Sequence, residues 1–326
     1  MTNIITLGAA TIDVFVNVTP EFRTDKKHID ACFPIGKKIL IDTLNTSTGG
    51  GAVNTAISFS RLGLKTSSVC AVGNDEHGHL IQQALLKEKV KFLGVCKKER
   101  TGYSIILTGL QHDRTILAFK GANNSLLPQD ISWNKLSTTW LYCTSMLGKS
   151  QKTLEQACLW AKKNQIPYAV NLSTYLATKG LRKLRKIVKN CDALIMNKEE
   201  AVALLGTPNL TTPQLLRKIQ EHAKIVVITD GPRGAVAYNG IHQYSIRPHH
   251  IKVIETTGAG DAFGSGFVAG LHLYHSIERA LQLGLVQSES VIQHIGATQG
   301  LLTRKHAEQQ MRRPARIKIT NIEPKF

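Results

Sequence analysis

The strongest constraint on the fold is an alternation of short apolar segments with longer amphipathic segments along a chain of 326 residues. The apolar segments have the length and composition of buried strands, and they lie at 4–7, 67–72, 139–143, 167–171, 193–196 and 225–229. The amphipathic segments between them predict helices at 54–62, 77–89, 150–164, 179–189 and 212–222. This alternation is typical of an α/β fold, in which helices cover both faces of a mostly parallel sheet.

Two stretches interrupt the alternation. Residues 14–48 and 101–120 contain strand-like segments, Lys38–Ile41 and Tyr103–Leu107 among them, without helices between them. They therefore depart from the pattern of the layered α/β body. The sequence contains no internal repeat and no obvious linker, so we expect one domain over residues 1–326. With 42% of its residues hydrophobic, a chain of this length can bury a large core.

Residues 255–267 combine a turn of small residues with an acidic side chain at the start of a predicted helix. Gly258 and Gly260 allow neighbouring N–H groups to point inward together, where the helix dipole favours an anion. Asp261 is then placed to take a proton from a hydroxyl, while the amides of Gly258, Ala259 and Gly260 hold the charge on a phosphoryl group. An ordinary capping aspartate after a tight turn explains these residues equally well on local evidence.

A run of three glycines near the N-terminus indicates a second candidate ligand-binding segment. Gly49, Gly50 and Gly51 cost chain entropy, which suggests main chain lying directly against a small ligand. Asn54 offers both a donor and an acceptor, the combination that a polyol requires. The alternative is a flexible loop with Asn54 capping the helix that follows.

Asp13 comes shortly after the predicted strand at 4–7. Because ligands bind at the carboxyl ends of strands in open α/β sheets, Asp13 is placed to accept hydrogen bonds from sugar hydroxyls. An ordinary turn aspartate is the alternative.

Two further turns follow buried strands in the second half of the chain. Asn197 caps a predicted helix, and Glu200 lies three residues later, which is the spacing of a structural capping interaction. Thr229 ends another strand, and the turn after it contains Gly231 and Gly234. On local evidence this turn is a hairpin turn.

In their order along the chain, these motifs resemble those of the ribokinase family of carbohydrate kinases, also called the PfkB family. The resemblance rests on Asp13, Gly49-Gly50 with Asn54, Val72-Gly73-Asn74-Asp75-Glu76-His77-Gly78, Gly121-Ala122-Asn123, Asn197-Lys198-Glu199-Glu200, Thr229-Asp230-Gly231 with Gly234, and Thr257-Gly258-Ala259-Gly260-Asp261. It implies a ribokinase-like three-layer sandwich with a mostly parallel central sheet. It also implies that segments 14–48 and 101–120 form a β-sheet lid over the sugar, and that ATP and Mg²⁺ take part.

The resemblance also implies a role for each motif residue. The acceptor sugar is implied to bind Asp13, Gly50, Gly51 and Asn54. The nucleotide phosphates and Mg²⁺ are implied to lie by Asn197 and Glu200, with the metal held largely through water, and further nucleotide contacts fall on Thr229, Gly231 and Gly234. The base is implied to be Asp261.

Two departures from the family pattern limit what it implies. Glu255 stands where the family usually has Asp, at a position that with Thr257 helps to bind a monovalent cation. Because the extra methylene moves the carboxylate by about a bond length, we predict a weak response to K⁺. Gly51 stands where ribose-specific members carry Lys, so ribose is not indicated.

Charge and cysteine usage bear on partners and location. The six cysteines form no C-x-x-C pair, and the sequence shows neither a secretory leader nor a membrane-spanning run, so a cytoplasmic location is expected. The net charge of +18 is concentrated at 179–189 and 304–318, yet no recognition motif favours nucleic acid. The exposed edges of a lid sheet predict a homodimer.

The sequence therefore predicts an ATP-dependent kinase that phosphorylates a sugar hydroxyl. We expect a neutral sugar as acceptor first, a nucleoside (an adenosine-like kinase) second and a sugar phosphate third. Basic residues in or beside the lid are candidates for binding such a phosphate, namely Lys37, Lys38, Arg114 and Lys120. A catalytically silent protein of the same fold that regulates or binds nucleic acid is the competing class, but it would not need Asp261, Asn197 and Glu200 together.

Overall fold

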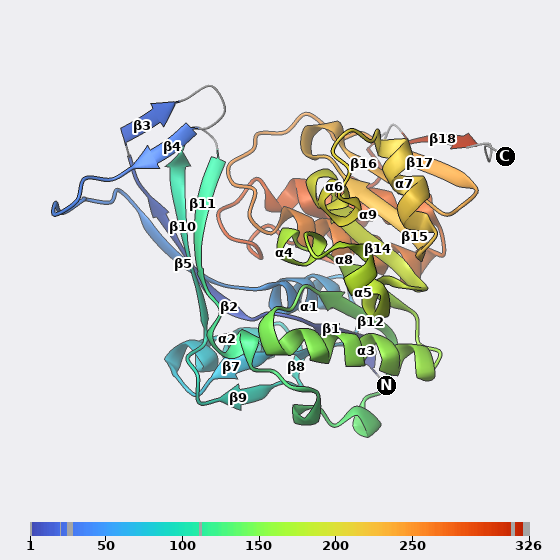
Figure 1. Cartoon of the computed structure of the whole chain (residues 1–326), viewed down its shortest axis with the longest axis horizontal. Coiled ribbons are helices and arrows are strands. Elements are labelled where there is room, and N and C mark those ends of the chain that lie inside the picture. The colour runs from blue at the N-terminus through green and yellow to red at the C-terminus, as the bar shows by residue number, and fades with distance from the viewer. Residues whose placement is uncertain (1, 20, 25–28, 111–112, 314–316, 322–326) are drawn as a thin grey trace.

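The computed structural model describes residues 2–19, 21–24, 29–110, 113–313 and 317–321. Its centre is a sheet of ten strands (Figure 1). From one edge to the other, the strands are β18 (Ile317–Asn321), β17 (His242–Ile246), β16 (Ala235–Tyr238), β15 (Ala223–Thr229), β14 (Cys191–Asn197), β13 (Tyr168–Asn171), β12 (Thr138–Thr144), β1 (Thr2–Leu7), β6 (Thr66–Val69) and β8 (Lys91–Phe92). The strands from β15 to β8 are parallel, whereas β15 to β18 pair antiparallel.

Helices cover both faces of this sheet, which gives the three layers that the sequence predicts. One face packs against α3 (Gln151–Lys163), α4 (Thr174–Ala177), α5 (Gly180–Val188), α6 (Lys198–Leu205) and α7 (Thr212–Gln220). The other face packs against α1 (Gly51–Arg61), α8 (Ala259–Tyr274), α9 (Ile277–Val291) and α10 (Arg304–Gln310). The α/β expectation is confirmed, and the predicted helices and strands lie within a few residues of those observed.

A smaller four-stranded sheet rises from one side of this body (Figure 1). Its strands, in the order β11-β10-β2-β5, are β11 (Asp113–Phe119), β10 (Gly102–Leu110), β2 (Thr11–Asn17) and β5 (Leu44–Gly49). Its base packs on α1 and α2 (Glu76–Lys87) through a separate apolar cluster. Two two-stranded sheets complete the fold, one from β3 (Glu21–Thr24) and β4 (Ile29–Cys32), and one from β7 (Ala71–Gly73) and β9 (Val95–Lys97).

Three local expectations are wrong. Lys38–Ile41 forms no strand, because it has no partner strand, and Leu40 is 92% exposed. The first small-sheet strand, β2, begins at Thr11, so Asp13 lies inside a strand of the small sheet and does not end a strand of the large one. The helix predicted to begin near Asn54 begins three residues earlier, at Gly51.

Candidate active site

Asp261 lies in the first turn of α8, where the sequence predicted it. Gly258 precedes the helix with φ of 83°, and a Cβ at this position would come within 2.5 Å of the Cβ of Ala297. Both the backbone conformation and the close packing therefore require glycine here. The Asp261 carboxyl group is partly buried, and burial raises its pKa, while a hydrogen bond from Asn54 acts in the opposite direction.

The partner of this carboxylate comes from α1. The Asn54 side-chain amide donates a 2.9 Å hydrogen bond to Oδ2 of Asp261. Asn54 therefore does not cap its helix, because Gly50, with φ of 92°, occupies the capping position. The Oδ1 atom of Asn54 is buried and receives no hydrogen bond from any described residue, so a ligand donor would satisfy it.

The run of three glycines has a structural reason at every position. A Cβ at Gly49 would lie 1.9 Å from Oδ2 of Asp13, and a Cβ at Gly50 would lie 2.5 Å from the carbonyl oxygen of Ala9. A Cβ at Gly51 would lie 2.6 Å from the hydroxyl of Thr144, and Gly51 also lines a cavity beside Asp261. The glycines thus bring α1 close to β2 as well as to the cavity.

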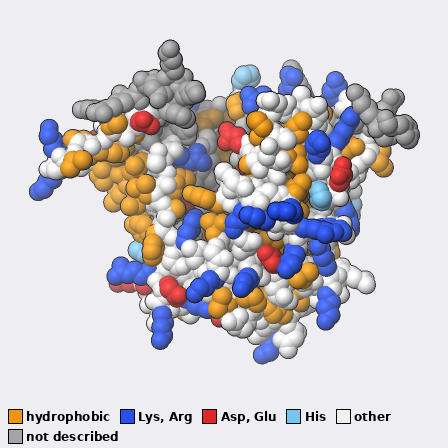
Figure 2. Space-filling model, in the orientation of Figure 1, with side chains coloured by type: hydrophobic (Ala, Val, Ile, Leu, Met, Phe, Trp, Pro, Cys, Tyr) orange, Lys and Arg blue, Asp and Glu red, His pale blue; other side chains and the backbone are white. Residues whose placement is uncertain are grey.

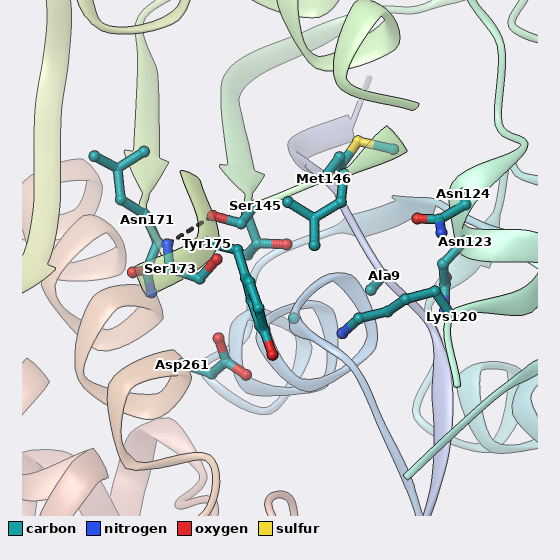
Figure 3. Close-up of a pocket in the computed structure, with 14 residues that line it drawn as sticks. Ala9, Lys120, Asn123, Asn124, Ser145, Met146, Asn171, Ser173, Tyr175 and Asp261 are labelled. Atoms are coloured by element: carbon teal, nitrogen blue, oxygen red, sulfur yellow. Dashed lines mark hydrogen bonds between the residues drawn. The ribbon is translucent and has the colours of Figure 1, made fainter. Parts of the chain in front are cut away.

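This first cavity has a volume of about 270 Å³ and is shown in Figure 3. Of the residues predicted to hold the acceptor, only Gly51 lines it; Asp13, Gly50 and Asn54 do not. Asp13 is 5% exposed, accepts a 2.9 Å hydrogen bond from the Thr11 hydroxyl, and has a pKa that burial raises.

Much of the rest of the cavity wall comes from the chain just after β11, from the carboxyl ends of β12 and β13, and from the segments that follow them. Lys120 was named only as a candidate for binding a sugar phosphate, whereas the sequence analysis missed Asn124, Ser145, Asn171, Ser173 and Tyr175. The Ser173 N–H donates to the Ser145 hydroxyl at 2.6 Å (Figure 3). The rule that ligands lie beyond the carboxyl ends of parallel strands would have found the residues that follow β12 and β13.

A second cavity, of about 280 Å³, shares Asp261, Asn171 and Leu172 with the first. Asp261 lines both cavities, and the second one is also lined by Asn197, Glu200 and Thr229, as well as Gly258 and Gly260. The fold therefore brings together residues of β14, α6, β15 and α8 that lie far apart in the sequence.

Asn197 and Glu200 form a reciprocal capping interaction. The N–H of Glu200 donates to Asn197 Oδ1, and the N–H of Asn197 donates to Glu200 Oε2, both at 2.8 Å. Oε1 of Glu200 accepts a 3.4 Å hydrogen bond from the Thr174 hydroxyl. Burial raises the pKa of Glu200, while hydrogen bonds from Asn197 and Thr174 act in the opposite direction. The capping interaction is therefore present, and the long contact at Oε1 leaves that oxygen capacity to accept a water molecule of a hydrated cation.

The turn after β15 is a hairpin turn, since Thr229 pairs with Ala235 across β15 and β16. Gly234, with φ of 92°, packs against the Ile246 carbonyl oxygen, which lies 2.0 Å from an ideal Cβ, so its role is structural. Gly231 lines a third and larger cavity of about 860 Å³, whose wall also includes Ala259. This cavity has a largely apolar wall, including Pro232, Val253, Leu285 and Ile292.

The turn before α8 is tied to the lid. Oε1 of Glu255 accepts hydrogen bonds from the N–H and hydroxyl of Thr257 at 2.8 and 2.6 Å. Arg114 of β11 donates a 2.5 Å hydrogen bond to the Thr256 hydroxyl, and its Nε lies 3.9 Å from Glu255 Oε1. Oε2 of Glu255 is buried and accepts no hydrogen bond from a described residue.

The other motif residues hold the scaffold. Asn123 exchanges two 2.8 Å hydrogen bonds with the main chain of Ala10, which fixes the chain just before β2. Asp75 caps α2 and accepts hydrogen bonds from the main chain and hydroxyl of Thr101. No cluster of metal-ligating acidic, histidine or cysteine side chains occurs among the residues that the structure describes. Within that same part of the chain, no helix has the length and apolarity needed to span a bilayer.

The basic segments lie largely at the surface. On α5 the apolar residues Leu184, Ile187 and Val188 are buried, while Arg182, Lys183, Arg185 and Lys186 are exposed, so the basic residues form the solvated face of an amphipathic helix. In α10, Arg304 pairs with Glu308 at 2.9 Å. Arg316 lies outside the described residues.

The chain resembles known proteins along nearly its whole length. The family model described as "pfkB family carbohydrate kinase" matches residues 1–304. An uncharacterized sugar kinase of Archaeoglobus fulgidus is 28% identical over 75% of this chain and 98% of its own length, and a ribokinase of Lactococcus lactis is 29% identical over 78% and 82%. The structure of Arabidopsis thaliana ribokinase complexed with ribose and ATP has a TM-score of 0.78 at 23% identity, covering 95% of this chain and 99% of that one. The chain belongs to the PfkB family of carbohydrate kinases.

Proposed function

We propose that the protein transfers the γ-phosphoryl group of ATP to a hydroxyl group of a sugar, with Asp261 as the general base. The observation that carries this proposal is that Asp261 lines two cavities of similar size, about 270 and 280 Å³. An acceptor in the first and phosphates in the second would meet at this carboxylate. Such an arrangement brings two reactants together in a fixed orientation.

The chain's own residues account for the steps of an in-line transfer. The acceptor hydroxyl gives its proton to Asp261 while its oxygen bonds to the γ-phosphorus, and the bond from that phosphorus to the bridging oxygen of ADP breaks. The N–H groups of Gly258 and Gly260 donate no hydrogen bond to any described residue, which leaves them able to hold phosphoryl oxygens. The third predicted amide, that of Ala259, has a long hydrogen bond of 3.2 Å to Thr256 O.

The nucleotide is assigned to the second and third cavities. Thr229 and Glu200 line the second, Gly231 lines the third, and Thr256 lines both, so a triphosphate and its nucleoside would extend from one into the other. The Arabidopsis thaliana ribokinase structure is a complex with ribose and ATP, which supports ATP as the donor. Gly234 supports this turn from behind without contributing a surface to either cavity.

Magnesium would be held near Asn197 and Glu200, largely through its own water molecules. When bound, the ion neutralises charge on the phosphates. The residues fit this role, because Glu200 lines the second cavity and keeps Oε1 largely unused.

On the acceptor side, we assign Gly51 to direct contact with the sugar, and Asn54 to orientation of both Asp261 and the acceptor. Asp13 and Gly50 lie next to this site, and Asp13 would reach the acceptor when the lid changes position. The first cavity, at about 270 Å³, is at the lower end of the range for small-molecule sites, which favours a sugar over a nucleoside.

A homodimer through the lid and a cytoplasmic location remain parts of the proposal. The competing class, a silent protein that binds nucleic acid, is not favoured, because the basic face of α5 is an ordinary solvated helix face and Asp261 lies at a cavity. A coupled assay of ADP release across sugars, sugar phosphates, sugar acids and nucleosides tests the function. The proposal fails if no acceptor stimulates ADP release while nucleic acid binds tightly with a steep salt dependence.

A further inference from the structure

A lysine in the wall of the candidate acceptor cavity forms no ion pair with any described residue. Lys120 follows the last residue of β11 and lines the first cavity together with Asp261. Its ammonium group forms no ion pair and no hydrogen bond with any residue that the structure describes. Its nearest recorded partner is the ring of Tyr175, whose centroid lies 5.8 Å from Nζ.

The surroundings of this ammonium group make it costly to leave its charge without a counter-ion. Lys120 is half-buried, and burial lowers its pKa, while the charge of Asp13 acts in the opposite direction. Asp13 does not pair with it directly, because no oxygen of Asp13 lies within 4 Å of Nζ, and Oδ1 of Asp13 accepts the Thr11 hydroxyl. A ligand anion would therefore supply what the protein does not.

The side chain of Lys120 points into the cavity that Asp261 also lines. In Figure 3, Lys120 enters the cavity from the side opposite to Asp261, and Tyr175 lies between them in this view. The asparagine next to it in the wall, Asn124, adds an uncharged donor on the same side. The reacting hydroxyl and the group held by Lys120 therefore belong to opposite ends of one small molecule.

We propose that Lys120 is the specificity-determining residue of the acceptor site and selects a sugar that carries an anionic group, a phosphate monoester or a carboxylate, at the end remote from the reacting hydroxyl. This inference rests on the proposed function. It reverses the order of acceptors expected from the sequence, which placed neutral sugars first. The net charge of +18 supports it further, because a positive field raises the local concentration of anionic ligands.

The test compares matched neutral and anionic acceptors in the coupled ADP assay at saturating ATP. Fructose against fructose 6-phosphate tests a phosphate, and glucose against gluconate tests a carboxylate. We expect the wild type to favour at least one anionic member by tenfold or more in kcat/KM. Preference for the neutral member of both pairs would overturn the proposal.

Two variants of Lys120 and one control variant separate a loss of acceptor specificity from a general loss of activity. Lys120→Met keeps the apolar stem and removes the charge, and we expect it to lower kcat/KM for the favoured anionic sugar at least tenfold, mainly through KM. Neutral sugars should change by less than about threefold, and Lys120→Arg should recover part of the loss. Lys149→Met, an exposed residue outside the cavity, removes the same charge and should leave the preference unchanged. Equal losses for neutral and anionic sugars in Lys120→Met would refute the role.

Thermal shift without ATP distinguishes failure of the anion site from failure of the phosphoryl-transfer function. If no acceptor supports ADP release but an anionic sugar raises the Tm of the wild type and not of Lys120→Met, the anion site stands and the phosphoryl-transfer function fails. If neutral sugars alone are phosphorylated, the function stands and the anion site fails. If no anionic sugar changes the rate or the Tm beyond its neutral match, the anion site is refuted.

Discussion

The side-chain amide of Asn54 donates a 2.9 Å hydrogen bond to Oδ2 of Asp261, and these two residues are 207 positions apart in the sequence. This bond joins α1 to the first turn of α8, which pack directly against each other. It fixes the orientation of one carboxylate oxygen and leaves Oδ1 of Asp261 to meet a ligand. It also favours the charged form of the carboxyl group, against the effect of burial.

The first prediction concerns Asp261 itself. Asp261→Asn keeps the shape and an acceptor for Asn54 but cannot take a proton, so kcat should fall about 100-fold or more while KM for the acceptor changes little. Steady-state ADP release measures both quantities. Full activity in this variant would remove Asp261 from the chemistry.

The thermal stability of Asp261→Asn is the control that shows whether the variant is folded. Because burial raises the pKa of Asp261 in the folded state, the charged carboxylate costs stability once the pH exceeds that pKa, and the cost disappears below the pKa of the unfolded chain. Asp261→Asn should therefore have a Tm at neutral pH no lower than that of the wild type. The difference between the two should shrink on acidification.

The second prediction concerns Asn54 and the pH profile. Removing its amide in Asn54→Ala takes away the hydrogen bond that lowers the pKa of Asp261, so that pKa should rise further. Because the base works only when deprotonated, the acidic limb of kcat/KM should move to higher pH. A profile measured from pH 5 to 9 checks this; an unmoved limb with a lower plateau would mean that Asn54 acts on acceptor binding alone.

The third prediction uses two glycines with opposite surroundings. A Cβ at Gly260 meets no atom within 4 Å, so Gly260→Ala should fold normally and gain up to about 1 kcal/mol from helix propensity. Its methyl group would enter the space proposed for the phosphoryl group, and kcat should fall about tenfold. In Gly49→Ala the methyl would collide with Asp13, so this variant should lose stability first. Thermal melts and rates on both variants give the comparison, and undiminished activity of Gly260→Ala would contradict the anion hole.

The regular parts of the fold were predictable because local patterns determine them. The apolar runs of β1, β12, β14 and β15 and the amphipathic period of α3 are strong signals of a layered α/β fold. Lys38–Ile41 was misread because an apolar run resembles a strand even when no partner strand lies beside it, and pairing partners are not encoded locally.

The site was only partly predictable. Asp261 was found because a turn of small residues before an acidic residue is a local signal. Lys120 was named only as one of four basic residues in or beside the lid, and Tyr175 carries no local signal, because their position in the wall of one cavity comes from the tertiary fold. Glu200 illustrates the opposite case, in which a local capping pattern and a cavity-lining position coincide in one side chain.

The fourth prediction concerns K⁺. Oε1 of Glu255 is already used by Thr257, and the Arg114 guanidinium supplies positive charge 3.9 Å away, so a monovalent cation has little left to provide. Replacing K⁺ by tetramethylammonium at fixed ionic strength should change kcat by less than about twofold. Oε2 of Glu255 has no described partner, so a strong stimulation by K⁺ would identify that oxygen as a cation ligand instead.

The last prediction concerns assembly. Figure 2 shows hydrophobic side chains gathered over the lid, where Ile105, Leu117 and Phe119 are 36%, 54% and 55% exposed. Ile105 pairs with Leu117 across β10 and β11, so their side chains share one face of the lid, and β11 is an edge strand.

An apolar face beside an unpaired strand edge is most readily covered by a second copy of the same lid. We expect light scattering to give a mass of twice 35.8 kDa at micromolar concentration, and Leu117→Lys to return the chain to the monomer. Leu159→Lys, on the exposed side of α3, changes the same residue types and should stay dimeric. A wild-type monomer at every concentration would exclude the lid as a self-association surface, and activity measured alongside would show whether each site works alone.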